Sequence, residues 1–260
     1  MLAPQRQQAI LDLVRQHGGV RVVELVRAFG VSDITIRRDL ELLAERGLLA
    51  KVHGGATTIG ATDEPGFAAK SVQQEEEKRA IAARAAGLVR PGTAVALSAG
   101  TTTWTLAHHL GTVPGLTVVT NSVRVADVLQ HAGRPDQTVV LTGGVRTPSD
   151  ALVGPVAVAA IRRLNVDLLF LGVHGMTARA GFTTPNLMEA ETDRALVEAA
   201  SRLVVLADHT KWGTVGISTI AQLGEADVVV SDTALPGPAR DVLAERAGEL
   251  VLAEVRGLTR

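Results

Sequence analysis

Apolar residues recur at helical spacing through the first 57 residues of the chain. Ile10, Leu13 and Val14 share one face of a helix that begins near Pro4. A second, shorter helix is predicted over residues 22–29. Faces of this kind are what a small helical domain buries in its core.

A third helix in the same region combines an apolar stripe with basic residues. Ser32 is a favourable N-cap for it. The residues that form the stripe are Ile36, Leu40 and Leu43. Arg38 points away from this stripe and Arg37 lies on its flank, so both arginines are expected at the surface.

A short apolar piece and a Gly-containing turn follow at residues 48–55. Three helices and a strand–turn element in this order match a winged helix-turn-helix, in which the third helix enters the DNA major groove. Two adjacent arginines are also typical of an ordinary solvated face, and a three-helix bundle can be purely structural. The pattern alone leaves both interpretations open.

Short apolar runs alternate with helical stretches in the rest of the chain. The runs are almost continuously apolar, as in parallel strands that are buried on both faces. We therefore expect a doubly wound α/β sheet. The predicted strands are 94–97, 117–119, 138–141, 168–171, 203–206, 228–230 and 250–252. The predicted domains are a winged helix-turn-helix over 1–57, a linker over 58–77 and an α/β domain over 78–260.

Small and polar residues follow six of these strands, at 98–103, 120–122, 142–144, 172–175, 208–211 and 231–232. The carboxyl ends of parallel strands meet at one edge, where open α/β folds bind ligands. Such residues are also common helix caps and turns in any α/β protein. Their concentration at one edge favours a polar ligand site.

The chemistry of this edge suits a phosphorylated small molecule. Gly100 lets the backbone approach a ligand, and residues 101–103 offer hydroxyls and N–H groups where a helix starts, which is an anion site. Gly143 and Gly144 could form a second such turn. Lys211, one of four lysines in the chain, could pair with a phosphate or carboxylate.

Hydrogen-bonding side chains at the same edge could bind the hydroxyl groups of a sugar. They are Asn121, Ser122 and Asp208. The adjacent histidines His108 and His109 lie in a predicted helix without a companion ligand motif, so we expect no metal site there.

The amino-acid composition excludes several kinds of site and of protein. The absence of cysteine excludes disulfides, thiolate metal sites and cysteine nucleophiles, and only 2% of residues are aromatic, which disfavours base-stacking platforms. No apolar run has the length of a membrane span, and we expect a soluble, cytoplasmic protein without a membrane partner. Motifs for P-loop nucleotide hydrolysis, serine hydrolases and zinc proteases are missing. We therefore predict no catalytic residues and no cofactor.

Charge is distributed unevenly. Residues 1–57 hold eight Lys and Arg against six Asp and Glu, whereas residues 58–260 hold 18 against 21. The whole chain has a net charge of −1. Residues 1–57, which we call the head, are mildly basic, and residues 58–260, the body, are mildly acidic. This distribution permits DNA binding by the head. The small excess of positive charge in the head argues against strong non-specific binding to DNA.

The sequence resembles the DeoR family of bacterial transcriptional regulators. In the head, the matching stretches are 31–40, with Leu43 and Gly47, and 53–56. In the body they are 99–103, 120–122, 142–144, 165–167 and 208–211. The matches occur in the family's order over nearly the whole chain. They imply a sensor fold related to ribose-5-phosphate isomerases and glucosamine-6-phosphate deaminases.

The resemblance also implies roles for particular residues. Operator DNA would be contacted by Ser32, Thr35, Arg37, Arg38 and the wing residues Lys51, His53 and Gly54. A sugar phosphate or related phosphorylated metabolite would be held by Gly100, Thr101, Thr102, Thr103, Asn121, Gly143, Gly144 and Lys211. Many family members carry an acidic residue where this chain has Ser98, so the sugar contacts are expected to differ.

We expect a homo-oligomer, a dimer or a tetramer, that represses a carbohydrate-catabolism operon. Its affinity for DNA is expected to change when the effector closes the loops at the carboxyl edge of the sheet. Two alternatives remain open from the residues. A sugar-phosphate isomerase or deaminase would use Asp208, Glu189, Glu191 and Lys211 for proton transfer. A DNA-binding protein whose body only assembles subunits would bind no effector.

Overall fold

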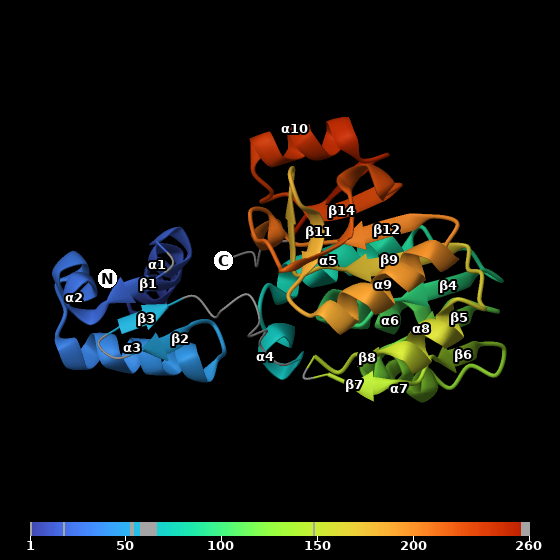
Figure 1. Cartoon of the computed structure of the whole chain (residues 1–260), viewed down its shortest axis with the longest axis horizontal. Coiled ribbons are helices and arrows are strands. Elements are labelled where there is room, and N and C mark those ends of the chain that lie inside the picture. Colours follow the sequence, from blue (N-terminus) through green and yellow to red (C-terminus); the bar gives the residue numbers. More distant parts are fainter. Residues whose placement is uncertain (1, 18, 53–54, 58–66, 148, 256–260) are drawn as a thin grey trace. The chain divides into compact units, whose positions relative to one another are not determined.

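The chain forms two compact units, Met1–Ala69 and Lys70–Arg260. The computed structural model (Figure 1) describes residues 2–17, 19–52, 55–57, 67–147 and 149–255. Each unit is built around apolar side chains of its own. We refer to them as the DNA-binding unit and the sensor unit, after the roles that the resemblance to the DeoR family implies for them.

The DNA-binding unit consists of three helices and a small antiparallel sheet in the order β1-β3-β2. The elements are α1 (Ala3–His17), β1 (Gly19–Arg21), α2 (Val22–Phe29), α3 (Asp33–Glu45), β2 (Ala50–Val52) and β3 (Gly55–Thr57). Ile36, Leu40 and Leu43 of α3 are buried, as predicted, together with Ile10 and Val14 of α1. The predicted winged helix-turn-helix is confirmed in this part of the chain, whereas β1 was not predicted because it is only three residues long.

A buried ion pair joins α1 to α3. Asp39 is only 3% exposed and accepts hydrogen bonds from Arg6 Nε at 2.6 Å and from Gln7 Nε2 at 2.8 Å. Both carboxylate oxygens are therefore paired. This acidic residue lies on the buried face of the helix, three positions after Ile36, and its role is to orient α3 on the domain.

The sensor unit is organised around a seven-stranded parallel sheet in the order β15-β14-β12-β9-β4-β5-β6. The strands are β4 (Ala94–Leu97), β5 (Thr117–Thr120), β6 (Thr138–Leu141), β9 (Leu168–Gly172), β12 (Leu203–Leu206), β14 (Val228–Asp232) and β15 (Leu250–Ala253). All seven predicted strands are present in this sheet. The doubly wound α/β fold is therefore confirmed.

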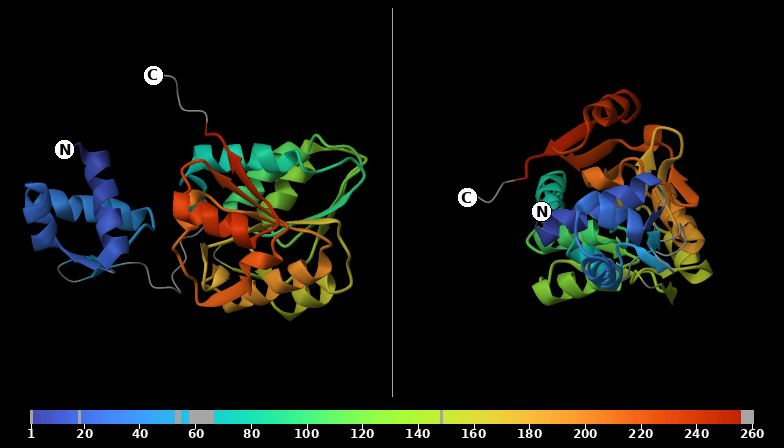
Figure 2. Two further views of the ribbon diagram at one scale, coloured as in Figure 1. Left: turned by 90° about the horizontal axis from the view of Figure 1, so that it is seen from above. Right: turned by 90° about the vertical axis from the view of Figure 1, so that its left-hand side faces the viewer.

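Helices cover both faces of the sheet, as the views in Figure 2 show. Successive side chains of β4 point to opposite faces: Val95 and Leu97 pack in one core and Ala96 in the other. One core includes residues of α5 (Glu75–Ala86), α6 (Thr101–Leu110) and α7 (Val123–Ala132). The other includes residues of α8 (Pro155–Ile161), α9 (Leu187–Ala199) and α10 (Gly237–Arg246).

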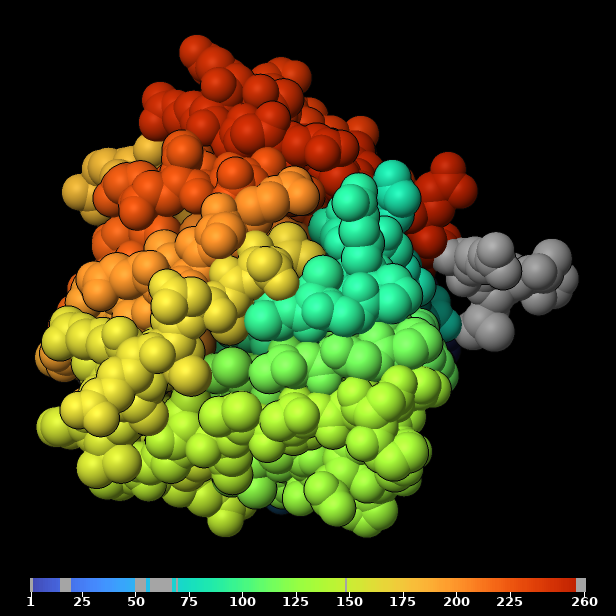
Figure 3. Space-filling view, turned by 90° about the vertical axis from the view of Figure 1, so that its right-hand side faces the viewer, coloured from blue at the N-terminus to red at the C-terminus, as the bar shows by residue number. Residues whose placement is uncertain are grey.

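Several short elements were not predicted from the pattern. They are α4 (Phe67–Ser71), the hairpin of β7 (Val145–Arg146) and β8 (Leu152–Val153), the sheet of β10 (Gly175–Thr177), β11 (Gly181–Thr184) and β13 (Ser218–Ala221), and the 3-10 turns η1 (His209–Lys211) and η2 (Leu223–Glu225). Both α4 and the start of α5 lie within the range predicted as linker. Figure 3 shows how segments distant in sequence lie side by side on one face of the sensor unit.

Among the helices that the structure describes, none is both long and apolar enough to cross a membrane.

The buried pair in the DNA-binding unit leads to a first prediction. Asp39→Ala leaves Arg6 buried without a counter-charge and should destabilise this unit by about 3–5 kcal/mol. The measurement is hydrogen exchange of the α1 and α3 amides in the full-length protein. Asp33→Ala is the control, because Asp33 pairs with Arg37 at the surface, with half of its side chain exposed, and should cost less than about 1 kcal/mol. Equal effects would show that the buried pair does not hold α1 to α3.

Candidate functional site

The start of α3 is fixed by hydroxyl groups. Ser32 is the N-cap, and its Oγ accepts a hydrogen bond from the Thr35 amide at 3.2 Å. The two hydroxyl oxygens are also within hydrogen-bond distance, 2.9 Å. These two predicted DNA-contacting residues therefore define where the recognition helix begins.

The solvent-facing side of α3 presents three long side chains in one helical turn. Arg37 and Arg38 are both exposed, as predicted. Arg37 donates to Asp33 one turn earlier, so its guanidinium is already paired. Ile34 is 79% exposed and lies one turn before Arg38. An apolar residue on the face opposite the buried stripe is the signal that could have identified Ile34 as a surface residue.

The wing holds the remaining predicted DNA contacts. Lys51 lies in β2, which pairs with β3 in antiparallel register. His53 and Gly54 lie outside the residues that the structure describes.

At the carboxyl edge of the sheet, the loop after β4 is bonded to its neighbour β9. Ser98 is fully buried, and its Oγ accepts a hydrogen bond from the Gly172 amide at 3.0 Å. The Ser98 amide donates to the Phe170 carbonyl at 3.1 Å. Ser98 therefore supports the loop by joining β4 to β9.

The helix after this loop begins with free backbone donors. Gly100 is the N-cap of α6, and the first helical bond runs from the Trp104 amide to the Gly100 carbonyl at 3.0 Å. The amides of residues 101–103 precede that bond and so have no partner within the helix. The hydroxyl of Thr103 donates to the carbonyls of Ser98 and Gly100, so this side chain shapes the loop from inside.

Asn121 ties three segments of the carboxyl edge together. It is 1% exposed, and its Oδ1 accepts from the Ala99 amide at 2.8 Å. Its Nδ2 donates to the Leu152 carbonyl at 3.3 Å, and its own carbonyl accepts from the Leu152 amide at 2.7 Å. The side chain thus connects the β4 and β5 loops to β8, which accounts for an asparagine at this position.

The glycine pair after β6 meets a steric requirement. Both residues have positive φ, 73° for Gly143 and 121° for Gly144. A Cβ on Gly144 would lie 2.6 Å from the Val153 carbonyl oxygen on β8. The pair therefore lets the chain turn tightly against β8, within the loop cluster that Asn121 organises.

A buried carboxylate with two nearby cations lies beyond β12. Asp208 is fully buried, and Oδ1 accepts from the Thr210 amide at 3.0 Å and from the Thr210 hydroxyl. Among the described residues, its Oδ2 has no hydrogen-bond partner. Burial alone would raise the pKa of Asp208, but Lys211, the Thr210 hydroxyl and Lys78 outweigh it and hold that pKa below its ordinary value.

Lys78 is the functional candidate that the sequence analysis missed. It lies on α5 with Ile81, Ala82 and Ala85, all buried at the spacing of one helical face. A lysine on an apolar stripe was the available signal, because lysine is almost never fully buried unless it is paired.

The next strand end contributes a second buried acid. Asp232, at the end of β14, is fully buried and accepts from the His209 amide at 2.7 Å. Its other oxygen lies 2.9 Å from His209 Nδ1. Asp232 thus fixes the η1 turn that carries Lys211.

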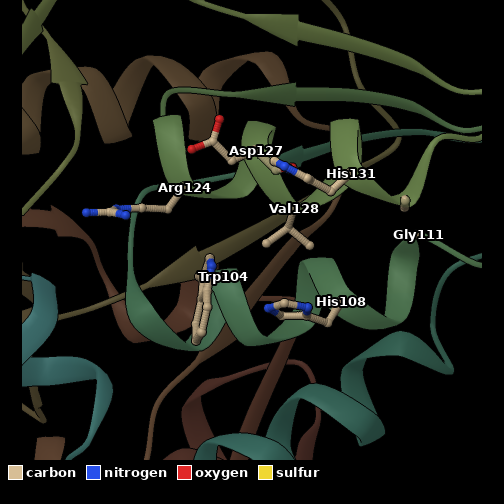
Figure 4. Close-up of a pocket in the computed structure, with 8 residues that line it drawn as sticks. Trp104, His108, Gly111, Arg124, Asp127, Val128 and His131 are labelled. Carbon is tan, nitrogen blue, oxygen red and sulfur yellow. The ribbon is translucent and has the colours of Figure 1, made fainter.

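A pocket of about 430 Å³ opens between α6 and α7 (Figure 4). Trp104 and His108 line it from α6, and Val128 and His131 from α7. No group of three or more His, Asp and Glu side chains suited to a metal ion occurs among the residues that are described.

Comparison with known proteins defines the class of both units. Residues 6–62 match the DeoR-like helix-turn-helix domain, and residues 73–233 match the DeoR C terminal sensor domain. The chain is therefore a DNA-binding transcriptional regulator with a sensor domain, and not an enzyme. It belongs to the DeoR family.

Full-length relatives share this organisation. The HTH-type transcriptional regulator GlpR of Haloferax volcanii is 40% identical over 257 residues, covering 97% of this chain and 98% of the relative. The glycerol-3-phosphate regulon repressor of Escherichia coli is 31% identical over 253 residues, covering 97% and 100%. GolR of Listeria innocua is 36% identical, covering 88% and 90%.

Solved structures similar to the chain include ribose-5-phosphate isomerases. One, in complex with phospho-erythronic acid, has a TM-score of 0.40 and 14% identity, covering 53% of this chain and 54% of that one. Ribose 5 phosphate isomerase A from Neisseria gonorrhoeae has a TM-score of 0.40 and 16% identity, with 56% of each chain covered.

The glycine turn leads to a second prediction. Gly144→Ala should destabilise the sensor unit by about 1–3 kcal/mol, because the methyl group meets β8 and the backbone has positive φ. Urea denaturation followed by tryptophan fluorescence measures this, since Trp104 and Trp212 both belong to the sensor unit. Gly237→Ala is the control, since a Cβ at that position meets no atom within 4 Å. Equal stability of the two variants would refute the steric role of Gly144.

Proposed function

We propose that this regulator represses a carbohydrate-catabolism operon, and that a sugar phosphate or related phosphorylated metabolite bound at the carboxyl edge controls its affinity for operator DNA. Support comes from the relatives, one of which is named a glycerol-3-phosphate regulon repressor. The observation that carries the effector half is a combination of groups at one sheet edge. These are the amides at the start of α6, which have no partner within that helix, and two lysines that act on the buried carboxylate of Asp208.

The polar groups at the carboxyl edge would have different roles in binding the effector. The amides at the start of α6 and the ammonium group of Lys211 suit a phosphate, which needs several donors and positive charge. The unpaired Oδ2 of Asp208 is an acceptor for a hydroxyl of the same metabolite. Thr103, Asn121, Gly143 and Gly144 would act by holding the loops in place.

On the DNA side, we propose that α3 lies in the major groove and that the β2–β3 wing contacts the backbone. Arg38 is an exposed cation of α3 and is suited to a guanine edge or a phosphate. Ile34, one turn away, is suited to contact a thymine methyl group. Ser32 and Thr35 would bind phosphate from the helix N-terminus, and Lys51, His53 and Gly54 would follow the adjacent backbone.

We further propose the domain limits 1–57, 58–77 and 78–260 and a homo-oligomer of two or four chains. A dimer would place two recognition helices on the two half-sites of a palindromic operator.

The DNA half is tested with a duplex selected by the full-length protein from a random pool. Arg38→Ala should weaken binding by about 1–3 kcal/mol, a loss of five- to 150-fold, and reduce the salt dependence of binding. Fluorescence anisotropy at several salt concentrations measures both. The control is Arg84→Ala, an exposed cation of α5 in the sensor unit. Unchanged affinity in Arg38→Ala, or an equal loss in the control, would remove α3 from the interface.

The effector half is tested with the same duplex and a panel of phosphorylated sugars and polyols that includes glycerol 3-phosphate. The ester that changes DNA affinity in the wild type should lose about ten- to 100-fold in potency with Lys211→Ala, because a charge-assisted hydrogen bond disappears. DNA affinity without the ester should be unchanged. Arg202→Ala is the matched control. Arg202 lies just before β12, at the amino end of the strand, whereas Lys211 lies beyond the carboxyl end of the same strand. Full potency with Lys211→Ala would contradict the proposed phosphate site.

A further inference from the structure

A buried carboxylate at the start of α9 is paired with hydroxyl groups. Glu189 lies in the first turn of α9 and is 9% exposed. Its Oε1 accepts hydrogen bonds from the hydroxyl of Thr147, at 2.8 Å, and from the hydroxyl of Ser149. Its Oε2 lies 3.5 Å from the Thr184 hydroxyl. Three neutral hydroxyls therefore face this carboxylate, whereas the buried Asp39 of the DNA-binding unit faces an arginine.

Glu189 lies toward the carboxyl edge of the seven-stranded sheet. A crossover helix runs antiparallel to the strands that it connects, and α9 leads into the amino end of β12, so the first turn of α9 lies toward the opposite edge. The carbonyl of Thr183, next to Thr184, accepts a hydrogen bond from the His174 amide at 3.1 Å. Since His174 belongs to the loop after β9, one side of the Glu189 carboxylate is joined to that loop.

Both neighbours of this carboxylate contact the loop that is proposed to bind phosphate. On one side, a Cβ on Gly100, the N-cap of α6, would lie 4.0 Å from the Cα of Gly172 at the end of β9. On the other, Asn121 accepts from the Ala99 amide at 2.8 Å and donates to the carbonyl of Leu152 in β8 at 3.3 Å. The β7–β8 hairpin, whose connection carries Thr147 and Ser149, therefore belongs to the same cluster of loops as the start of α6.

The β7–β8 hairpin has anchors that do not involve Glu189. Asp150 is 6% exposed and accepts hydrogen bonds from Arg124 Nε at 2.7 Å and from Arg146 Nε at 2.8 Å. The Leu152 amide also donates to the Asn121 carbonyl at 2.7 Å. The hydroxyls of the connection can therefore leave Glu189 while these bonds keep the hairpin on the sheet.

The two hydroxyls on Oε1 resemble a pair of neighbouring hydroxyls of a sugar. Thr147 Oγ1 and Ser149 Oγ are 2.9 Å apart, a spacing that hydroxyls on adjacent carbons of a sugar also reach. Hydroxyls of either source donate to a carboxylate in the same way. A diol can therefore take their place and leave the carboxylate with the same number of donors.

We propose that Glu189 is an effector-binding residue that accepts two neighbouring hydroxyls of the effector, which displace the hydroxyls of Thr147 and Ser149. The effector class is then a phosphate ester that carries hydroxyls on adjacent carbons. This inference rests on the proposed function, because it assumes that the phosphate group binds at the start of α6 and Lys211. It adds the group that recognises the rest of the molecule.

The hydroxyls of the ester and those of the hairpin compete for one carboxylate oxygen. Removing the Ser149 hydroxyl removes a competitor and favours the ester. Removing the carboxylate leaves the hydroxyls of the ester out of water without an acceptor, which disfavours the ester. A carboxylate that only held the hairpin would respond in the same way to both changes, because both break the same hydrogen bond.

The test is calorimetric titration of the full-length protein with glycerol 3-phosphate, ribose 5-phosphate and glucose 6-phosphate, and with n-propyl phosphate as the ester without hydroxyls. In the wild type, at least one hydroxylated ester should bind more tightly than n-propyl phosphate. Glu189→Met should reduce this preference about tenfold, and Ser149→Ala should increase it about threefold. Inorganic phosphate should bind both variants as it binds the wild type. Glu191→Met, which changes an exposed residue of the same helix, is the control and should keep the wild-type preference.

Opposite shifts in Glu189→Met and Ser149→Ala would support the inference. Shifts in the same direction, no shift, or a wild type that prefers no hydroxylated ester would overturn it, although binding of inorganic phosphate would still support the phosphate site. If neither inorganic phosphate nor any ester binds, the proposed function fails and the inference fails with it. If Glu189→Met does not fold, Ser149→Ala decides alone, because the loss of a purely structural bond would not raise the affinity for hydroxylated esters only.

Discussion

Parallel pairing of the seven strands is the constraint on which the sensor unit depends. Because the strands are parallel, their carboxyl ends lie at the same edge, and the loops after β4, β5, β9, β12 and β14 gather there. The interior strands β9, β12 and β14 are buried along almost their whole length, whereas the edge strand β6 is partly exposed. The carboxyl edge is therefore the place where polar groups gather. The clustering of polar groups at this edge is therefore a consequence of the sheet topology.

Buried charges define the two functional regions in different ways. In the DNA-binding unit, both oxygens of Asp39 are paired, and the carboxylate fixes α1 against α3. In the sensor unit, one oxygen of Asp208 has no hydrogen-bond partner within the described part of the chain, and the carboxylate is stabilised by Lys211 and Lys78. The fully paired acid, Asp39, serves architecture. We propose that a ligand completes the arrangement around the partly paired acid, Asp208.

The sequence predicted those parts that depend on repeated hydrophobic patterns. The seven core strands are apolar on both faces, and α3 has a regular stripe, so their positions could be predicted to within a few residues. Two- to four-residue strands such as β7 and β8 are too short to show a period, and α4 lies in a stretch without one. Side-chain roles were harder to predict. Asn121 and Thr103 face the loops they support, and Lys78 becomes a candidate only when α5 packs against β12 and β14.

The proposed recognition of a phosphate group by the carboxyl edge can be measured as thermal stability of the full-length protein with matched pairs of phosphorylated and unphosphorylated sugars and polyols. We expect a concentration-dependent rise in Tm with one ester and no rise with its parent, because only the ester engages the α6 amides and Lys211. An equal rise with the parent compound, or no rise with any ester, would contradict it.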